Sequence, residues 1–188
     1  LTSEVVPNWM ADASSVTEGD TILEIGPGTG MLTKVLLQRG AKVIAIEADI
    51  RAVEELSSTF TDEITSGKLT IHHGDAREIN AQKLNLSGGS FKVVSNIPYY
   101  LSGFLLRSLL ESANQPSTLT FLIQKELAQR IARDKKESLL SLSVKVFGNP
   151  QYKKTVSRGH FFPKPNVDSA IITISDINNY NFGKITPE

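Results

Sequence analysis

The sequence predicts an α/β fold in which helices flank a mostly parallel, twisted sheet. Two observations predict it: several short apolar strands each end in glycine or a polar residue, and a helical pattern follows the first of them. Residues 21–25 form this first strand, and the apolar positions of residues 31–37 have helical spacing that stops before Gly40. A strand, a tight loop and a helix in this order are typical of open α/β sheets, which bind ligands at the carboxyl ends of their strands.

The loop between this strand and this helix holds three glycines at alternate positions, Gly26, Gly28 and Gly30. Glycine lets a backbone come within contact distance of a ligand, which a Cβ would prevent. The spacing Gly-X-Gly-X-Gly differs from the Gly-X-Gly-X-X-Gly of pyrophosphate-binding loops. The loop is a weak signal alone, but it favours a ligand without a diphosphate over NAD or FAD.

Acidic residues follow the second and third strands. Residues 42–46 lead into Glu47, which lies 21 residues after Gly26, where a carboxylate can accept hydrogen bonds from ribose hydroxyls. The alternative for Glu47 is a solvated helix cap. Residues 69–73 lead into Gly74-Asp75-Ala76, and Asp75 can accept a hydrogen bond from an adenine amino group of the ligand.

The fourth strand, apolar at residues 91–94, leads into Asn96-Ile97-Pro98-Tyr99. An adenine amino group is a poor nucleophile because its lone pair is delocalised into the ring, so an enzyme that methylates it must hold acceptors against both N–H bonds. The side-chain oxygen of Asn96 is one candidate acceptor. Because Ile97 precedes a proline, it is biased to an extended conformation that leaves its carbonyl free as the second acceptor. Tyr99 offers a flat face on which a base can stack.

Asn-X-Pro-Tyr by itself is also an ordinary exit from a strand into a turn. The four strand ends together favour the chemical interpretation, because parallel strands gather their carboxyl ends along one edge of the sheet. A nucleoside-containing ligand beside a pair of amino-group acceptors is the arrangement that an S-adenosylmethionine enzyme requires. Such chemistry needs no metal, and His72, His73 and His160 show no metal-ligand spacing.

Several separated motifs together resemble the ribosomal RNA small-subunit adenine N6,N6-dimethyltransferases of the KsgA type. The resemblance extends from Leu1 to about Ser175 and is highly specific in combination. Besides the glycine loop, Glu47, Gly74-Asp75-Ala76 and Asn96-Ile97-Pro98-Tyr99, the matching segments are residues 124–131 (Gln-Lys-Glu-Leu-Ala-Gln-Arg-Ile), residues 142–144 (Leu-Ser-Val) and residues 161–169 (Phe-Phe-Pro-Lys-Pro-Asn-Val-Asp-Ser). The resemblance implies a Rossmann-like, S-adenosylmethionine-dependent methyltransferase fold.

The resemblance also implies roles for single residues. Asn96 would touch both cofactor and target, and Tyr99 and Phe161 would form aromatic walls around the target adenine. The alternative for Phe161 is that both it and Phe162 are simply buried. The residues expected to bind the cofactor are Leu1, Glu24, Gly26, Gly28, Glu47, Asp75, Ala76 and Asn96, and those expected at the catalytic centre are Asn96, Ile97, Pro98, Tyr99 and Phe161.

The family pattern sets the expected domain organisation. Residues 1–176 are expected to form the methyltransferase domain, and residues 177–188 a linker toward a helical C-terminal domain that is absent from this sequence. Leu1 corresponds to the last residue of a Gln-Asn-Phe-Leu element, so the first three residues of that element are missing. Residues 100–103 and 136–139 depart from the family pattern, which puts local RNA contacts in doubt more than the chemistry.

Composition limits the classes of protein that fit. The 188 residues are 40% hydrophobic and 21% charged, enough to bury a full core as one α/β domain. The absence of cysteine excludes disulfides and thiolate metal sites and is compatible with a reducing cytosol. No apolar run approaches the roughly 20 residues that span a bilayer, and no signal peptide is visible.

The net charge of zero is unusual for a protein that binds rRNA, because phosphate contacts dominate such affinity. Two local clusters of cations could still contact RNA phosphates despite the zero net charge, and they are expected to flank the base pocket. The alternative is that the first of them is only a solvated helix face. The clusters are Arg130, Arg133, Lys135 and Lys136, and Lys153, Lys154, Arg158 and Lys164.

The sequence therefore predicts an enzyme that dimethylates N6 of two adjacent adenines near the 3′ end of small-subunit rRNA and supports ribosome biogenesis. It is expected to be a cytoplasmic monomer that acts on an immature ribosomal subunit, without contact to a membrane. Three alternatives remain: a large-subunit rRNA adenine methyltransferase, a DNA adenine or cytosine-N4 methyltransferase, and a non-catalytic RNA-binding or transcription-factor relative.

Overall fold

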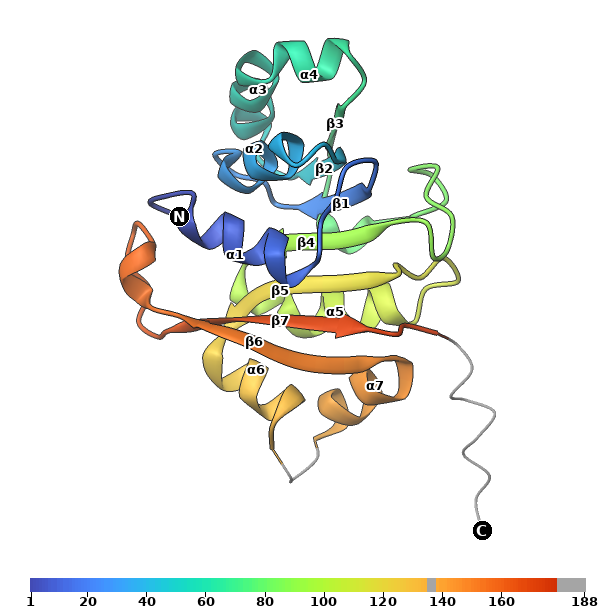
Figure 1. Ribbon diagram of the computed structural model, residues 1–188, viewed down its shortest axis with the longest axis vertical. Coiled ribbons are helices and arrows are strands. Elements are labelled where there is room, and N and C mark those ends of the chain that lie inside the picture. The colour runs from blue at the N-terminus through green and yellow to red at the C-terminus, as the bar shows by residue number, and fades with distance from the viewer. Residues whose placement is uncertain (135–137, 179–188) are drawn as a thin grey trace.

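A computed structural model describes residues 1–134 and 138–178. Its centre is a seven-stranded sheet of order β3-β2-β1-β4-β5-β7-β6 (Figure 1). The strands β1 to β5 are parallel, and β7 is antiparallel to both β5 and β6. The strands are β1 (Thr21–Ile25), β2 (Lys42–Glu47), β3 (Leu69–His73), β4 (Lys92–Asn96), β5 (Thr118–Gln124), β6 (Asn149–Val156) and β7 (Ser169–Ser175).

The helices precede the first strand or lie between successive strands. They are α1 (Val5–Ala13), α2 (Met31–Gln38), α3 (Ile50–Thr59), α4 (Thr61–Thr65), α5 (Ser102–Leu110), α6 (Lys125–Ala132) and α7 (Leu139–Phe147), with the short 3-10 helices η1 (Ala76–Glu78), η2 (Tyr99–Leu101) and η3 (Arg158–His160). The predicted fold class is confirmed, as are the first and third strands. The second strand is one residue longer than predicted, and the first predicted helix extends to Gln38.

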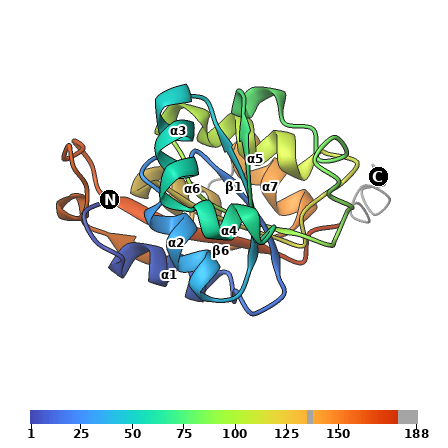
Figure 2. The ribbon, with the colours of Figure 1, turned by 90° about the horizontal axis from the view of Figure 1, so that it is seen from above.

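The sheet lies between two layers of helices. Helices α1 and α2 cover one face and α5 and α7 the other (Figure 2). Successive side chains of a strand point to opposite faces, so Leu23 and Ile25 belong to the core beneath α5, α6 and α7, whereas Ile22 belongs to the core beneath α1 and α2. The strands are apolar on both sides because both faces are covered.

The carboxyl ends of β1 to β4 lie along one edge of the sheet. The N-terminal residues and the segment between β6 and β7 lie at the same edge (Figure 1). They are joined there by a hydrogen bond of 3.0 Å from the main-chain nitrogen of Thr2 to the carbonyl oxygen of His160. Distant parts of the sequence thus surround the edge that the strand pattern predicted as the site.

The predicted domain boundary falls just after β7, which ends at Ser175. Most of the predicted linker, from residue 179 onward, lies outside the described residues, and so do Lys135 and Lys136 of the first cationic cluster. Among the helices that the structure describes, none combines the length and the apolar character needed to cross a membrane.

Replacing Gly30 by alanine should destabilise the fold for two reasons. Gly30 has φ +77°, and a Cβ there would lie 2.6 Å from Cε2 of Phe60 and 2.8 Å from Cδ2 of Leu56, both in the core. The control is Gly19→Ala, because Gly19 has φ +84° but open space around it. Overpacking should make the loss of unfolding free energy about 1 to 3 kcal/mol larger for Gly30→Ala than for Gly19→Ala. Urea unfolding followed by circular dichroism measures both; equal losses would contradict the packing role.

Candidate functional site

The site lies where the order of the strands reverses, between β1 and β4. Only Ile22–Lys92 and Leu23–Val93 pair between these strands. Beyond them, the main-chain nitrogen of Ile25 donates instead to the buried hydroxyl of Ser95, at 2.8 Å. The ladder therefore stops before the carboxyl ends, at the kind of position where open α/β sheets bind ligands.

Three adjoining cavities occupy this position, and Gly26 lines all of them. We call them the aromatic cleft, of about 420 Å³, the glycine pocket, of about 210 Å³, and the side pocket, of about 520 Å³. The aromatic cleft contains every residue predicted at the catalytic centre: Asn96, Ile97, Pro98, Tyr99 and Phe161. Of the predicted cofactor residues, Leu1, Glu24, Gly26, Gly28 and Asn96 line the glycine pocket, and Gly26, Glu47, Asp75 and Ala76 line the side pocket.

The glycine loop leaves room for a ligand. A Cβ on Gly26 or Gly28 would meet no atom within 4 Å, so a side chain there would fill open space beside the pocket. The main-chain nitrogen of Gly28 donates to Oε2 of Glu47, at 3.1 Å. The loop is thereby tied to the end of β2, and the two parts of the predicted cofactor site hold each other in place.

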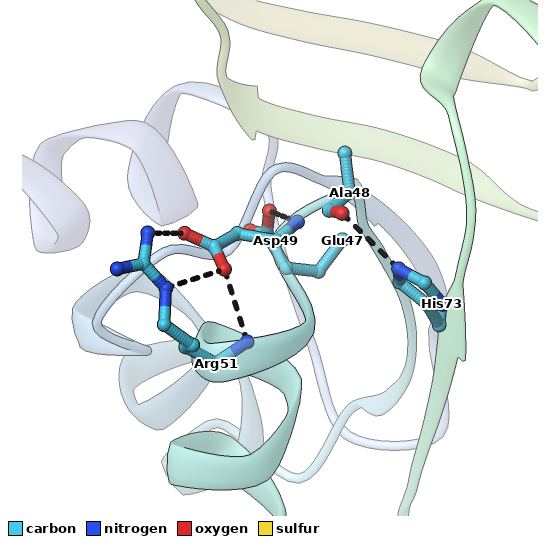
Figure 3. Close-up of polar contacts among 5 residues, drawn as sticks. All are labelled: Glu47, Ala48, Asp49, Arg51 and His73. Carbon is cyan, nitrogen blue, oxygen red and sulfur yellow. Dashed lines mark hydrogen bonds and ion pairs between the residues drawn. The ribbon is translucent and has the colours of Figure 1, made fainter.

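Glu47 is held by the main chain on both of its oxygens. In addition to the bond from Gly28, its Oε1 accepts from the main-chain nitrogen of Asp49, at 3.0 Å (Figure 3). The cap of α3 is Asp49, whose Oδ1 accepts from the main-chain nitrogen of Arg51, at 3.0 Å. The alternative interpretation of Glu47 as a helix cap is therefore wrong. A carboxylate has about four acceptor positions, so the Glu47 oxygens can still accept from ribose hydroxyls.

Glu24 is a buried carboxyl beside the glycine pocket, with only 1% of it exposed. Burial raises the pKa of Glu24 to about 8; the hydroxyl of Thr33, which donates at 2.7 Å, opposes the rise, and the nearby charge of Glu47 adds to it. Near neutral pH, this carboxyl therefore holds a proton in the absence of a cationic partner. An ammonium group placed in the pocket would favour the ionised form.

Asp75 is engaged by a neighbour that the sequence analysis did not identify. Its Oδ1 accepts from the main-chain nitrogen of Arg77, at 2.8 Å, and Nε of Arg77 lies 3.0 Å from both carboxylate oxygens. These hydrogen bonds lower the pKa of Asp75 to about 2. Asp75 thus stays an anion at any physiological pH, and Arg77 fixes its direction at the edge of the side pocket.

The segment after β4 presents free polar groups in the cleft. Within the described part of the chain, neither the carboxamide of Asn96 nor the carbonyl of Ile97 has a hydrogen-bond partner. The hydroxyls of Tyr99 and Ser169 lie 2.7 Å apart, so the first residue of β7 holds the tyrosine ring. Ser169 ends the family motif of residues 161–169, but nothing in the sequence indicated its contact with Tyr99, which is 70 positions away.

Both phenylalanines of the segment before Pro163 line the aromatic cleft. Phe161 packs partly against the core beneath α1 and α2, whereas Phe162 is 86% exposed. The alternative in which both rings are buried is therefore wrong. Phe161 lies in the same cleft as Tyr99 and Asn96, as its place in the family pattern predicts.

Some cations of the two clusters have structural partners. Arg130 pairs with Glu126 at 2.8 Å, and the guanidinium of Arg133 lies 3.8 Å from the ring centre of Tyr152. Nζ of Lys154 lies 4.0 Å from the ring centre of Trp9. Arg130 and Glu126 form an exposed ion pair on one helix. This pair supports the interpretation of the first cluster as a solvated helix face.

Two of the histidines also contact protein groups. The Nε2 of His73 lies 3.1 Å from the carbonyl oxygen of Ala48 (Figure 3), and the ring of His160 packs edge-on against Trp9. Within residues 1–134 and 138–178, no group of three or more potential ligands is placed to hold a metal ion.

The pKa of Glu24 leads to a prediction for folding stability. The folded protein keeps a proton on Glu24 up to about pH 8, whereas the unfolded chain releases it above its ordinary value of 4.5. Stability due to this group is therefore complete below pH 4.5 and decreases as the pH rises toward 8, by up to about 1.4 kcal/mol per pH unit. Glu24→Gln should abolish this decrease. Urea unfolding of both proteins between about pH 5 and about pH 8.5 measures it; parallel pH curves would contradict the assignment.

Comparison with known proteins gives concordant results. The ribosomal RNA adenine dimethylase family matches residues 1–181. The chain is 35% identical over 175 residues to ribosomal RNA small subunit methyltransferase A of Dehalococcoides mccartyi, and this match covers 93% of the chain and 59% of the relative. The protein of the same name from Clostridium botulinum is 34% identical, with 95% of the chain and 65% of the relative covered. The chain thus spans about three fifths of the length of these curated relatives.

Solved structures show the same fold. A dimethyladenosine transferase from Plasmodium falciparum is 29% identical, with a TM-score of 0.78 over 94% of this chain and 62% of that one. The 23S rRNA methyltransferase ErmE has a TM-score of 0.80 at 24% identity over 93% of this chain and 68% of that one, a likeness in fold alone. Because the family match spans nearly the whole sequence, this chain belongs to the ribosomal RNA adenine dimethylase family.

Proposed function

We propose that this chain uses S-adenosylmethionine to dimethylate N6 of adjacent adenines near the 3′ end of small-subunit rRNA, within an immature ribosomal subunit. The observation that carries the proposal is that Gly26, Glu47, Asn96, Tyr99 and Phe161 line one cleft. The names of the relatives and of the Plasmodium structure support this choice of reaction and substrate.

The residues of the glycine and side pockets fit S-adenosylmethionine. Gly26 and Gly28 leave the space that the ligand needs, Glu47 can accept from its ribose hydroxyls, and Asp75, which is anionic, can accept from its adenine amino group. Glu24, beside the glycine pocket, suits its methionine ammonium, directly or through water. When bound, the cofactor supplies a methyl group made electrophilic by its sulfonium.

The aromatic cleft suits an unpaired adenine. Tyr99 and Phe161 can stack on the base, and the hydrogen bond to Ser169 holds the tyrosine in place for it. The free oxygens of Asn96 and Ile97 can accept the two N6 hydrogens, which draws the nitrogen lone pair out of conjugation with the ring. The chain then contributes mainly alignment of the nucleophile.

The loss of the N6 proton needs no strong base. This proton becomes acidic only as the new carbon–nitrogen bond forms, so the oxygens of Asn96 and Ile97 need only accept a hydrogen bond from it until it is released to water. After one transfer and exchange of the spent cofactor, the monomethylated amino group still has one hydrogen and can rotate to present its lone pair again. The same residues therefore serve both methylations.

The proposal includes a monomer that acts in the cytoplasm, with residues 1–176 as the catalytic domain and residues 177–188 as a linker to a helical domain. The absence of cysteine is compatible with a reducing compartment. The length of the curated relatives supports a further domain beyond the part that this chain covers. Such a domain would supply additional cationic contacts to RNA phosphates.

Glu47→Ala should weaken the binding of S-adenosylmethionine by about 1.5 to 3 kcal/mol, the range for hydrogen bonds to a charged group. The control is Glu54→Ala, which removes an exposed carboxylate from α3, away from the cavities. Isothermal titration calorimetry measures both affinities. Equal affinities for the two variants would reject the placement of the cofactor ribose at Glu47.

Asn96→Ala should reduce the rate of methyl transfer by about 100-fold or more, if its acceptor acts in the transition state. The assay uses immature small ribosomal subunits, with mass mapping of the modified adenines. Naked DNA and large subunits serve as competing substrates, and preferential methylation of either would replace the proposed substrate. Unchanged turnover in the variant would reject the role of Asn96.

A further inference from the structure

A second groove, of about 570 Å³, adjoins the aromatic cleft and takes no part in the proposed chemistry. We call it the amide groove, because three carboxamide side chains line it. Its wall comes from the end of β5, the first turns of α6 and the segment between β6 and β7. The lining residues that matter here are Gln124, Lys125, Gln129, Arg158, Asn166 and Val167.

Several polar side chains of the amide groove are available to a ligand, whereas Nη1 of Arg158 already donates to the carbonyl oxygen of Asn166, at 3.1 Å. Within the described residues, the carboxamides of Gln124, Gln129 and Asn166 make no hydrogen bond, so each offers both a donor and an acceptor. The ammonium of Lys125 has no ion-pair partner in the same part of the chain. A carboxamide can pair in bidentate fashion with adenine at N6 and N7, and a cation can contact a phosphate.

The acidic residues of the groove are already engaged. Glu126, which lines the groove, pairs at 2.8 Å with Arg130, which does not line it. Oδ1 of Asp168 accepts from the main-chain nitrogen of Arg158, at 3.0 Å. The lining thus holds two cations, Lys125 and Arg158, and two carboxylates, and Arg130, beside the lining, adds a cation next to Glu126.

The amide groove and the aromatic cleft share a wall. Gln124 pairs with Ser169 across β5 and β7, and the hydroxyl of Ser169 bonds to Tyr99 in the cleft. Asn166 directly follows Pro165, which lines the cleft. The wall is rigid, because the main-chain nitrogen of Lys125 also donates to the carbonyl oxygen of Asp168, at 3.0 Å. The groove therefore lies beside the cleft in which the target base is proposed to stack.

We propose that the amide groove binds the nucleotide adjacent to the target adenine in single-stranded RNA, and that it selects adenine there. Gln124, Gln129 and Asn166 would read the edge of the neighbouring base, and Lys125 and Arg158 would contact its phosphate. This inference rests on the proposed function for the identity of the target. It explains a preference during one of the two modifications, in which one adenine occupies the cleft while its unmodified neighbour occupies the groove.

The first test compares three fluorescent RNA hexamers by anisotropy, without cofactor: UUAAUU and two versions in which uracil replaces one or the other adenine. The chain should bind UUAAUU about 5- to 150-fold more tightly than either uracil version, the scale for discrimination by one bidentate base contact. The triple variant Gln124→Ala, Gln129→Ala, Asn166→Ala should bind all three alike. Gln38→Ala, on exposed α2 surface, is the matched control and should keep the preference.

The second test concerns the phosphate contact. Lys125→Met should reduce the slope of log Kd against log salt concentration by about 0.7, the value for one phosphate of a single strand. Lys68→Met is the control, because Lys68 is exposed and precedes β3 at the opposite edge of the sheet. Thermal melting of every variant checks that the fold is intact, and Gln129→Ala alone replaces the triple variant if that one is unstable.

Equal affinity for the three hexamers, no binding at millimolar RNA, or a preference that survives in the folded groove variants would overturn the proposal. The assay needs no methyl transfer, so its failure is distinct from that of the proposed function. If the chain methylates RNA but shows no preference for the neighbouring adenine, only the proposed role of the groove is rejected. If the chain shows a preference that depends on the groove residues but transfers no methyl group, the role of the groove stands and the proposed reaction is rejected.

Discussion

The parallel hydrogen-bonded alignment of β1 to β4 is the constraint on which the site depends. Because Ile25 pairs with Ile46, and Glu47 with His73, the polar residues that end successive strands come to one edge of the sheet. The early end of the ladder between β1 and β4 opens that edge at the point where the strand order reverses. The position of the cavities therefore depends on this arrangement of the backbone.

The site is held by polar contacts that satisfy groups the sheet leaves unpaired. The main-chain nitrogen of Ile25 has no main-chain acceptor on β4 and donates to the hydroxyl of Ser95 instead. The carboxylate of Glu47 accepts from the glycine loop and from the residue that caps α3, so it ties these two segments together. Glu24 is an exception, because burial of its carboxyl disfavours the ionised form and raises its pKa well above the ordinary value. A cation in the adjoining glycine pocket would favour the ionised form of this carboxyl.

The antiparallel strands β6 and β7 flank a segment that completes the aromatic cleft and the amide groove. Their connecting segment supplies Phe161 to the aromatic cleft and Asn166 to the amide groove. Ser169, at the start of β7, contacts both the tyrosine of the cleft and, through the ladder, Gln124 of the groove. One short segment thereby links the aromatic cleft to the amide groove.

The sequence by itself determined the strand ends, the glycine loop and the Asn96–Tyr99 segment, because these depend on local periodicity and on the conformational limits of glycine and proline. It also identified Phe161 by its place in a family pattern. Only the tertiary structure decided that Ser169 holds Tyr99, that Glu24 is buried enough to stay protonated, and that Gln124 and Asn166 share a groove. Those properties depend on the packing of residues far apart in the chain, and neither the spacing nor the composition of a single sequence encodes which distant surfaces meet.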